Sequence, residues 1–569
     1  MSAPLIAATI AHLMANTESG AVLVFVPGWR EIKDVEDELR TRRWSSIDFN
    51  DPERFKIVLL HSLFPSGLTE ATDPVPEGCR RILIATDIAE TSLTFPDIKY
   101  VIDSGKRRSP EYDALSSVNK LYRTWVSKAS ATQRAGRAGR VKSGEYYALF
   151  SEQRHRSMAP FRPPEAMTPE AIQRVILRVR LHFPTIPVEK YFSNWLEPPP
   201  QLQLDTALRR LQDEDVLTEH GEVTPFGRLV ARLGTSPSMA RMILLGVVFQ
   251  CLDPILVIAA MALHNVPLFT HPDSAVAAMQ HRNLRLTLSE GARSDHIALL
   301  NAYRTMTRRE RTHGTDAACD WAAANDVSLI HYKSVSVGAR RLSKVLAQYG
   351  LIPDHRMDMA NLRSENTALL TALICAGLAP NIAAHASSYR FLTKGGLHAE
   401  VPHESLLRPQ EWRAGTWMPN PLKGTLCVYS GIHQATDPLE GNDFTLLRDV
   451  TPVSELAVAL FGGPLNVADG DLLVDGWLPL RTSGSDEAVH QIAKFRELWD
   501  SALATTFKGL AVGIGSDASR EVKREIAALE DVVQAVVSLL DQDERARLER
   551  AAALLPRREL ESSNVEDTS

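Results

Sequence analysis

The sequence predicts a multidomain α+β protein that begins with an α/β domain on a parallel sheet and continues through helical segments to a small β-barrel. Three observations lead to this prediction. Five short runs that are apolar on both faces recur within the first 155 residues, a nearly all-apolar helical stretch follows at 236–262, and alternating apolar runs begin after residue 365. At 569 residues the chain is also too long for a single hydrophobic core.

The five apolar runs are typical of strands in the middle of a parallel sheet, because both of their faces are apolar. They lie at 21–28, 56–62, 81–87, 100–105 and 146–150, and helical patterns separate them. Ligands of such sheets bind beyond the carboxyl ends of the strands. We therefore expect functional residues directly after the runs, where the sequence places Gly28, His61, Ser62, Thr86 and Asp103.

The segment QRAGRAGR at 133–140 carries the strongest chemical signal. If a helix runs on from Ser130, one of its faces carries Gln133, Arg137 and Arg140. Two guanidinium groups beside an amide suit the oxygens of a transferring phosphoryl group and the attacking water. The alternative is a solvated basic helix face, which the two glycines of the segment and the five neighbouring strands disfavour.

The region from Gly20 to Phe150 resembles the second RecA-like domain of DEAH/RHA-type ATP-dependent RNA helicases. Four blocks carry the resemblance, in the order and at the spacing of the family. GAVLVFVPGWREI is similar to motif IV, LLHS to the short motif that follows it, RILIATDIAETSLT to motif V, and QRAGRAGR to motif VI. The resemblance implies a RecA-like domain over residues 1–157.

The resemblance also implies a role for each matching residue. Arg137 and Arg140 would be arginine fingers, Gln133 would help to position the hydrolytic water, and Ser92 would sense the nucleotide. The RNA backbone would be contacted by Gly28, His61, Ser62, Thr86 and Thr94. The stretch 105–127 corresponds to a hairpin that wedges against the nucleic acid; the alternative is a plain surface hairpin.

Two positions depart from the family pattern. Asp87 stands where motif V commonly has Asn, so its charge either weakens the contact with the RNA backbone or is held by a local hydrogen bond. An acidic residue usually lies two positions after the SLT of motif V, but Pro96 stands there and Asp97 follows. We do not expect Asp97 to reach a ribose.

The other half of a nucleotide site has no counterpart in this sequence. A phosphate loop needs GxxxxGK[ST], whereas the only Gly-Lys pair, Gly105–Lys106, is followed by Arg107. No DEAH-type acidic box follows a strand, and the first strand begins about twenty residues from Met1. We therefore expect the first RecA-like domain to be missing from this chain. ATP with Mg²⁺ would be the cofactor of the complete enzyme, and we do not expect it to bind tightly to this chain alone.

Residues 158–350 are mostly helical. Helical patterns at 169–184 and 205–230, with a tight GEVTPFG turn, make residues 158–228 similar to the winged-helix domain of these helicases, whose family role is structural. The apolar stretch 236–262 predicts a buried helix pair, and residues 229–350 resemble the family's ratchet domain. Six later basic residues would either line an RNA channel or be ordinary solvated charges: Arg308, Arg309, Arg311, Lys333, Arg340 and Arg341.

Short alternating runs over 365–455 predict a small antiparallel barrel, which resembles the oligonucleotide-binding (OB) fold of this family. Three of its side chains would stack on and hold single-stranded RNA: Tyr389, Arg390 and Lys394. A partly helical extension is expected over 456–545 and a disordered tail over 546–569. In the 518–545 helix an apolar seam either binds a protein partner or packs on its own domain; its residues are Val522, Ile526, Leu529, Val533, Val536 and Leu540.

Bulk composition restricts the functional classes. The net charge of -6 gives no global attraction to nucleic acid, so RNA must be bound by local patches. Five scattered cysteines without a CxxC pair indicate a reducing compartment and argue against a zinc site: Cys79, Cys251, Cys319, Cys375 and Cys427. The sequence shows neither a signal peptide nor a membrane-spanning run. We expect an intracellular protein of the cytoplasm or nucleus, without membrane association.

Three functional hypotheses follow from these observations. In the first, the chain is the C-terminal part of an RNA helicase that uses ATP hydrolysis to translocate on and unwind RNA, and it binds mainly single strands through their backbone. In the second, it is a catalytically inactive truncated paralogue that acts as an RNA- or protein-binding module. In the third, a separate polypeptide supplies the phosphate loop. The intact motif VI arginines favour the first and third.

Overall fold

The computed structural model comprises two compact units, which are described separately. Unit 1 is Met1–Asp113 with Asn119–Ala166, and unit 2 is Ala114–Val118 with Met167–Ser569. The structure describes residues 2–42, 44, 47–61, 70–91, 95–113, 118–138, 143–161, 169–264, 268–270, 275–348, 351–352, 360–409, 420–436, 443–468, 470–480, 486–512 and 518–553.

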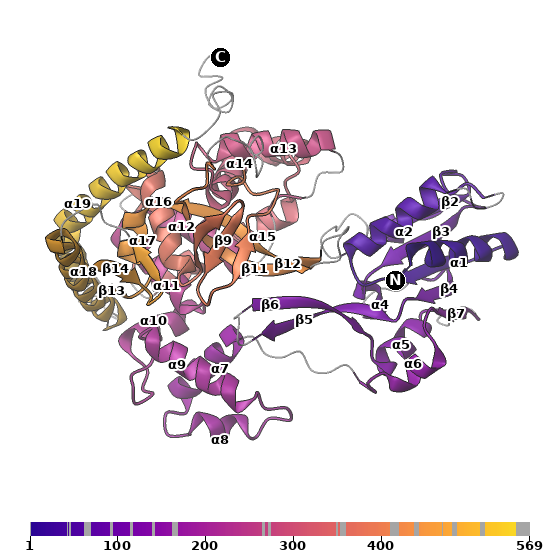
Figure 1. Ribbon diagram of the computed structural model, residues 1–569, viewed down its shortest axis with the longest axis horizontal. Helices are drawn as coiled ribbons and strands as arrows, with labels where there is room; N and C mark the ends of the chain where they lie inside the picture. The colour runs from indigo at the N-terminus through magenta and orange to yellow at the C-terminus, as the bar shows by residue number, and fades with distance from the viewer. Residues whose placement is uncertain are drawn as a thin grey trace, which may run out of the picture. The chain divides into compact units, whose positions relative to one another are not determined.

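Unit 1 is built on a five-stranded sheet with the strand order β2-β3-β1-β4-β7 (Figure 1). Every pairing within this sheet is parallel. The strands are β1 (Ala21–Phe25), β2 (Phe55–Leu60), β3 (Arg80–Ala85), β4 (Ile98–Asp103) and β7 (Glu145–Ala148). Each coincides with one of the five apolar runs, so the predicted parallel sheet is confirmed.

Both faces of this sheet are buried, which explains why the strands read as continuous apolar runs. Val22 and Val24 lie in the cluster formed with helices α1 (Ala3–Asn16) and α2 (Trp29–Thr41). Leu23 and Phe25 lie in the opposite cluster, which includes residues of α4 (Ile88–Thr91). Helix α1 was not predicted from the sequence pattern. Its carboxyl end is held by Arg80, whose guanidinium donates to the carbonyls of Thr17 (2.8 Å) and Gly20 (3.2 Å).

The remaining elements of unit 1 follow β4. Strands β5 (Lys106–Asp113) and β6 (Val118–Trp125) pair with each other, so the predicted hairpin is present. They are followed by α5 (Lys128–Ala135) and, after β7, by α6 (Glu152–Ser157). Ser127 and Ser151 cap these two helices, because each hydroxyl accepts a main-chain N–H three residues on, at 3.1 Å.

A run of helices in unit 2 precedes a barrel in the chain. They are α7 (Pro169–His182), α8 (Val188–Phe192), α9 (Gln201–Asp213), α10 (Pro225–Leu233), α11 (Pro237–Val248), α12 (Leu252–His264), α13 (Ala275–Leu288), α14 (Asp295–Ala324), α15 (Leu329–Gln348) and α16 (Thr367–Leu378). The helical pattern over 205–230 is interrupted by a turn, as predicted, but the turn begins before the GEVTPFG segment at 221–227. It starts after Asp213, pairs Leu217 with Val223, and ends where α10 begins at Pro225 behind the Thr224 cap.

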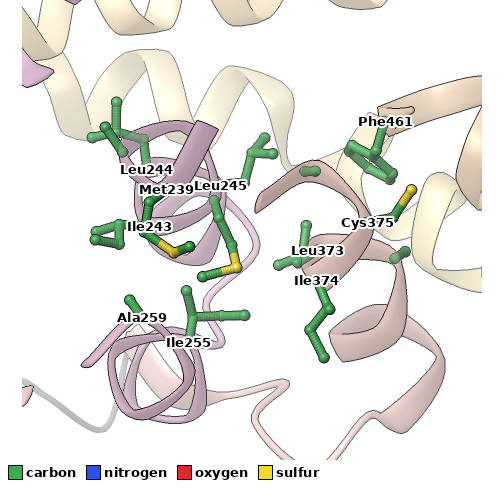
Figure 2. Close-up of a cluster of buried hydrophobic side chains, with 14 of the residues drawn as sticks. Met239, Ile243, Leu244, Leu245, Ile255, Ala259, Leu373, Ile374, Cys375 and Phe461 are labelled. Carbon is green, nitrogen blue, oxygen red and sulfur yellow. The ribbon is translucent and has the colours of Figure 1, made fainter. Parts of the chain in front are cut away.

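The core of unit 2 confirms the buried helix pair predicted at 236–262. Helices α11 and α12 contribute almost wholly buried side chains and pack with α16 and α17 (Glu455–Phe461). Figure 2 shows Ile243, Leu245 and Ile255 of the pair in one buried cluster with Leu373 of α16. A Cβ at Gly246 would come within 3.2 Å of Ile255, so glycine there lets α11 and α12 approach closely.

The predicted small barrel is confirmed as a closed five-stranded barrel with the order β10-β12-β11-β8-β9. It is antiparallel as predicted except at the β10–β12 pairing, which is parallel. Its strands are β8 (Ile382–Ser387), β9 (Arg390–Thr393), β10 (His398–Glu400), β11 (Leu426–Thr436) and β12 (Asp443–Val453). Phe391, Cys427 and Leu447 are among the fully buried residues of its interior.

The C-terminal extension holds more than helices. A three-stranded sheet, β13 (Leu465–Ala468), β14 (Asp471–Val474) and β15 (Leu478–Leu480), precedes α18 (Asp486–Val512) and α19 (Ala518–Ala553). Helix α19 therefore continues into the segment expected to be a tail, and residues 554–569 lie outside the described residues. Of the apolar seam, Val533, Val536 and Leu540 are buried in the chain's own core. Leu529 packs against that core, and the side chains of Val522 and Ile526 are not among those described. The seam thus packs on its own domain over its described length.

Candidate functional site

The carboxyl edge of the unit 1 sheet brings together the segments that the sequence singled out. Gly28 follows β1 and is the N-cap of α2, with no side-chain cap hydrogen bond. A Cβ atom at this position would lie 2.7 Å from Nε of Arg108, which belongs to the hairpin strand β5. The Arg108 guanidinium lies directly over the Gly28 backbone, so a side chain at position 28 would displace it.

Glu31, in the first turn of α2, is a site residue that the sequence analysis missed. Its side chain is buried and pairs with Arg123 of β6 at 2.6 Å and with Arg108 at 3.5 Å. One carboxylate therefore fastens both strands of the basic hairpin to the start of α2. The available signal was an acidic residue in the first turn of a helix that follows a glycine, opposite a strongly basic stretch.

His61 directly follows β2, as predicted, and its ring packs edge-on against Trp29 with centroids 5.8 Å apart. Burial lowers the pKa of His61, and the positive charge of Arg108 lowers it further, whereas the Asp87 carboxylate raises it. The net shift is downward, so the imidazole is neutral at pH 7 and can donate one hydrogen bond and accept another. The carboxylate of Asp87, the unusual residue of motif V, thus affects the pKa of His61, which is itself a predicted RNA-contact residue.

Thr86 follows β3 and is buried. Its main-chain N–H donates to Leu60 O at 3.3 Å, and its carbonyl accepts from Ala89 N at the start of α4. Asp97, which the sequence did not assign to a ribose, pairs with Arg81 at 3.1 Å. Four predicted site residues lie outside the described residues: Ser62, Ser92, Thr94 and Arg140.

The helix of motif VI is shorter than expected, and this changes its geometry. Helix α5 ends at Ala135, and Arg137 and Ala138 continue in tighter turns whose N–H groups bond three residues back. The expected common face is therefore not kept through Arg137: Gln133 is exposed, whereas Arg137 is buried with 6% of its surface accessible. The Arg137 guanidinium donates to the main-chain carbonyl of Glu90, in motif V.

Arg134, which the sequence analysis passed over, is the fully buried centre of this edge. Its Nε pairs with Glu90 at 3.0 Å and its Nη1 with Asp103 at 2.8 Å. Asp103 also accepts hydrogen bonds from Gly105 N and from the Tyr146 hydroxyl, both at 2.8 Å. Opposite charges outweigh the effect of burial and raise the pKa of Arg134, so this cation ties motif VI to motif V and to the end of β4.

The barrel residues predicted to hold RNA are already engaged within unit 2. Arg408 lies over the Tyr389 ring at 3.8 Å, Arg390 pairs with Glu400 at 3.2 Å, and Lys394 pairs with Asp475 at 2.7 Å. These contacts favour a structural role for the three side chains. The six basic residues of α14 and α15 are all exposed, as both of their interpretations require.

Within the described part of the chain, no helix is long and apolar enough to cross a membrane. No group of three or more His, Cys, Asp or Glu side chains there is placed to hold a metal ion. All five cysteines are free thiols.

Comparisons with known proteins match both units. Residues 6–142 match the helicase conserved C-terminal domain, and residues 236–299 match the ratchet-like helicase associated domain HA2. These matches confirm the RecA-like domain and the ratchet region expected from the sequence. They also place the described sheet edge, from Gly28 to Arg137, within a helicase domain.

Several curated helicases are similar to most of this chain. It is 32% identical over 466 residues to the DExH-box ATP-dependent RNA helicase DExH6 of Arabidopsis thaliana, covering 81% of this chain and 35% of that protein. It is 30% identical over 517 residues to the ATP-dependent DNA/RNA helicase DHX36 of Mus musculus, covering 88% and 48% respectively. The chain thus spans less than half the length of these relatives. It belongs to the DEAH/RHA-type helicases and corresponds to their C-terminal region.

Proposed function

We propose that this chain is the C-terminal part of an ATP-dependent RNA helicase, in which it supplies the arginine-finger half of the ATP site and contacts to the RNA backbone. The observation that carries this proposal is the double contact at Glu90. Arg134 pairs with its side chain, and Arg137 donates to its main-chain carbonyl. Movement of the motif VI arginines toward a nucleotide would therefore pull on motif V, the segment that would contact RNA.

The residues of this chain supply only part of a binding site for ATP with Mg²⁺. Gln133 is exposed and can offer its amide, whereas Arg137 is buried and would have to leave the Glu90 carbonyl to reach a phosphate oxygen. The sequence holds no GxxxxGK[ST] loop, and the described residues form no carboxylate cluster for a metal ion. The remaining ligands would have to come from outside this sequence, so tight binding of ATP to this chain alone is not expected. A phosphate loop on a separate polypeptide would satisfy the same requirement.

RNA would be bound mainly as a single strand through its phosphates, at the edge that holds Gly28, His61 and Thr86. The helices α9 and α10 with the turn between them would form a winged helix with a structural role, and the barrel would be an OB fold. The unpaired thiols support an intracellular location, because cysteines stay reduced in the cytoplasm and nucleus.

The test is RNA-stimulated ATP hydrolysis by the protein as isolated from its own cells, with Arg137→Ala as the variant. Loss of an arginine finger lowers kcat by about 10³-fold. Arg174→Ala is the matched control, because this exposed arginine of α7 lies outside unit 1 and should leave kcat within about twofold. Circular dichroism of each variant excludes misfolding.

Two results would contradict the proposal in different ways. If Arg137→Ala keeps the hydrolysis rate of the unchanged protein, Arg137 is not a finger. If the native protein binds RNA but hydrolyses no ATP, the alternative holds, and the chain is an inactive RNA- or protein-binding module.

A further inference from the structure

The open end of the β5–β6 hairpin carries a cluster of cations that is arranged around Trp125. Lys106 Nζ lies 3.5 Å from the centroid of the Trp125 ring, and the guanidinium carbon of Arg154, on α6, lies 4.8 Å from it. Phe150 supports the ring edge-on at 6.4 Å. Trp125 is still 37% exposed, so the cluster lies at the surface of unit 1. Cation–π contacts of this kind position the two side chains without neutralising them.

Positive charge accumulates at this cluster. Burial lowers the pKa of Lys106, and the cations of Arg123 and Arg154 lower it further. Neither Lys106 nor Arg154 forms an ion pair with any carboxylate among the described residues, although Arg156, on the same helix as Arg154, does pair with Glu152 at 2.5 Å. Cations of like sign that are held close together repel one another, and a bound anion would relieve that repulsion.

A chain of contacts joins the cluster to the sheet edge. Arg108 crosses over Gly28, and Glu31 links Arg108 to Arg123. Arg123 is also close enough to Lys106 to lower its pKa. Within the described residues, Glu31 is the one carboxylate that pairs with any of these cations, so a path of excess positive charge runs from Gly28 to Arg154.

We propose that Lys106 and Arg154, held around Trp125, form with the neighbouring Arg123 a phosphate-binding extension of the RNA surface. This inference rests on the proposed RNA binding and names the residues that lengthen the site. The cations already cover the Trp125 ring, which favours phosphodiester groups over stacked bases as the ligand. Continuity with the sheet edge favours a nucleic-acid strand over an acidic protein segment.

The test compares salt dependence of binding, with fluorescein-labelled 20-nucleotide oligouridine as the probe and the whole chain as the protein. Each phosphate contact on a single strand contributes about 0.7 to the slope of log K against log salt concentration. The double variant Lys106→Gln/Arg154→Gln should therefore lower that slope by about 1.4 and weaken binding uniformly across RNA sequences. Arg156→Gln/Arg174→Gln removes the same net charge from exposed positions outside the cluster and should leave the slope unchanged.

A further variant separates the ring from the charges. Trp125→Leu keeps both cations but removes the ring that holds them, so it should weaken binding while the slope is retained. Circular dichroism checks that each variant is folded.

Each alternative result has a definite meaning. If the chain binds the probe and both double variants give the same slope as the unchanged chain, the extension is wrong and the sheet edge alone binds RNA. If the unchanged chain does not bind the probe, both the extension and the proposed RNA binding fail. If polyglutamate of the same length competes as well as oligouridine, the cluster is a general anion site, and its assignment to nucleic acid is overturned.

Discussion

Two buried ionic centres, one in each unit, hold distant segments together in opposite ways. In unit 1, Arg134 is a cation between two carboxylates, and its Nη2 finds no hydrogen-bond acceptor among the described residues. In unit 2, Asp295 at the start of α14 is an anion whose two oxygens accept four hydrogen bonds. The donors are the Arg285 guanidinium (2.9 Å), the Ser405 hydroxyl (2.7 Å) and the N–H groups of Leu406 (3.0 Å) and Val450 (2.9 Å).

The difference indicates what each centre does. Asp295 is fully satisfied, so it behaves as a permanent latch between α14, the loop after β10, and β12. Arg134 keeps an unused donor at the edge where a ligand is expected, and its partners Glu90 and Asp103 lie on segments that the ligand would touch. Buried polar groups are normally satisfied. Because Arg285 Nε beside Asp295 also has no acceptor among the described residues, it is the location of Arg134 at the sheet edge that distinguishes the two centres. We interpret the Arg134 centre as adjustable and the Asp295 centre as structural.

Breaking the Asp295 centre should have the larger effect. In Asp295→Asn the negative charge that faces Arg285 is lost. The NH2 of the new amide also faces groups that are themselves hydrogen-bond donors. We expect unit 2 to lose about 3–5 kcal/mol of stability, measured by urea unfolding, with faster hydrogen exchange in residues 402–409. Asp316→Asn is the control, because this exposed residue of α14 should change stability by less than about 0.5 kcal/mol. Equal effects of the two substitutions would show that Asp295 is not a latch.

Breaking the Arg134 centre should cost less. Arg134→Gln leaves Glu90 and Asp103 buried without their cation, but Asp103 keeps its hydrogen bonds from Gly105 and Tyr146. We therefore expect a loss of about 3 kcal/mol, confined to unit 1 in hydrogen exchange. Gln133→Ala, at the exposed neighbouring position, is the control and should be close to neutral. A loss in unit 1 above that measured for Asp295→Asn in unit 2 would reverse the ranking of the two centres.

The sequence predicted what depends on local pattern and missed what depends on long-range pairing. The strands of the sheet were found because burial of both faces leaves unbroken apolar runs. The end of α5 could have been found too, since Gly136 is a helix-stop signal within motif VI. The partners of Arg134 could not, because Glu90 lies 44 residues away in the chain and no spacing rule selects it. Charges that meet only after folding, such as Glu31 with Arg123, are invisible to periodicity.

The smallest predicted effect concerns pH and sharpens the same comparison. His296 follows Asp295, and its Nδ1 lies 2.8 Å from the Thr451 hydroxyl oxygen. Burial lowers the pKa of His296; Asp449 and Asp295 raise it and Arg448 lowers it, and the net shift is downward. Because the folded-state pKa lies below the unfolded value near 6.5, the unfolded state takes up the proton first as the pH falls.

The stability contributed by neutral His296 is therefore complete above pH 6.5 and declines below it, by at most about 1.4 kcal/mol per pH unit. Urea unfolding of unit 2 between pH 7.5 and 5.5 should show this decline, and His296→Gln should reduce its slope. His220→Gln, at an exposed position after α9, should leave the slope unchanged. If His296→Gln also leaves it unchanged, the acid sensitivity of unit 2 does not arise at this latch. The stability of the Asp295 centre would then not depend on pH in this range. The unit 1 edge would be the remaining place to look for such a dependence, because the pKa of His61 is also lowered.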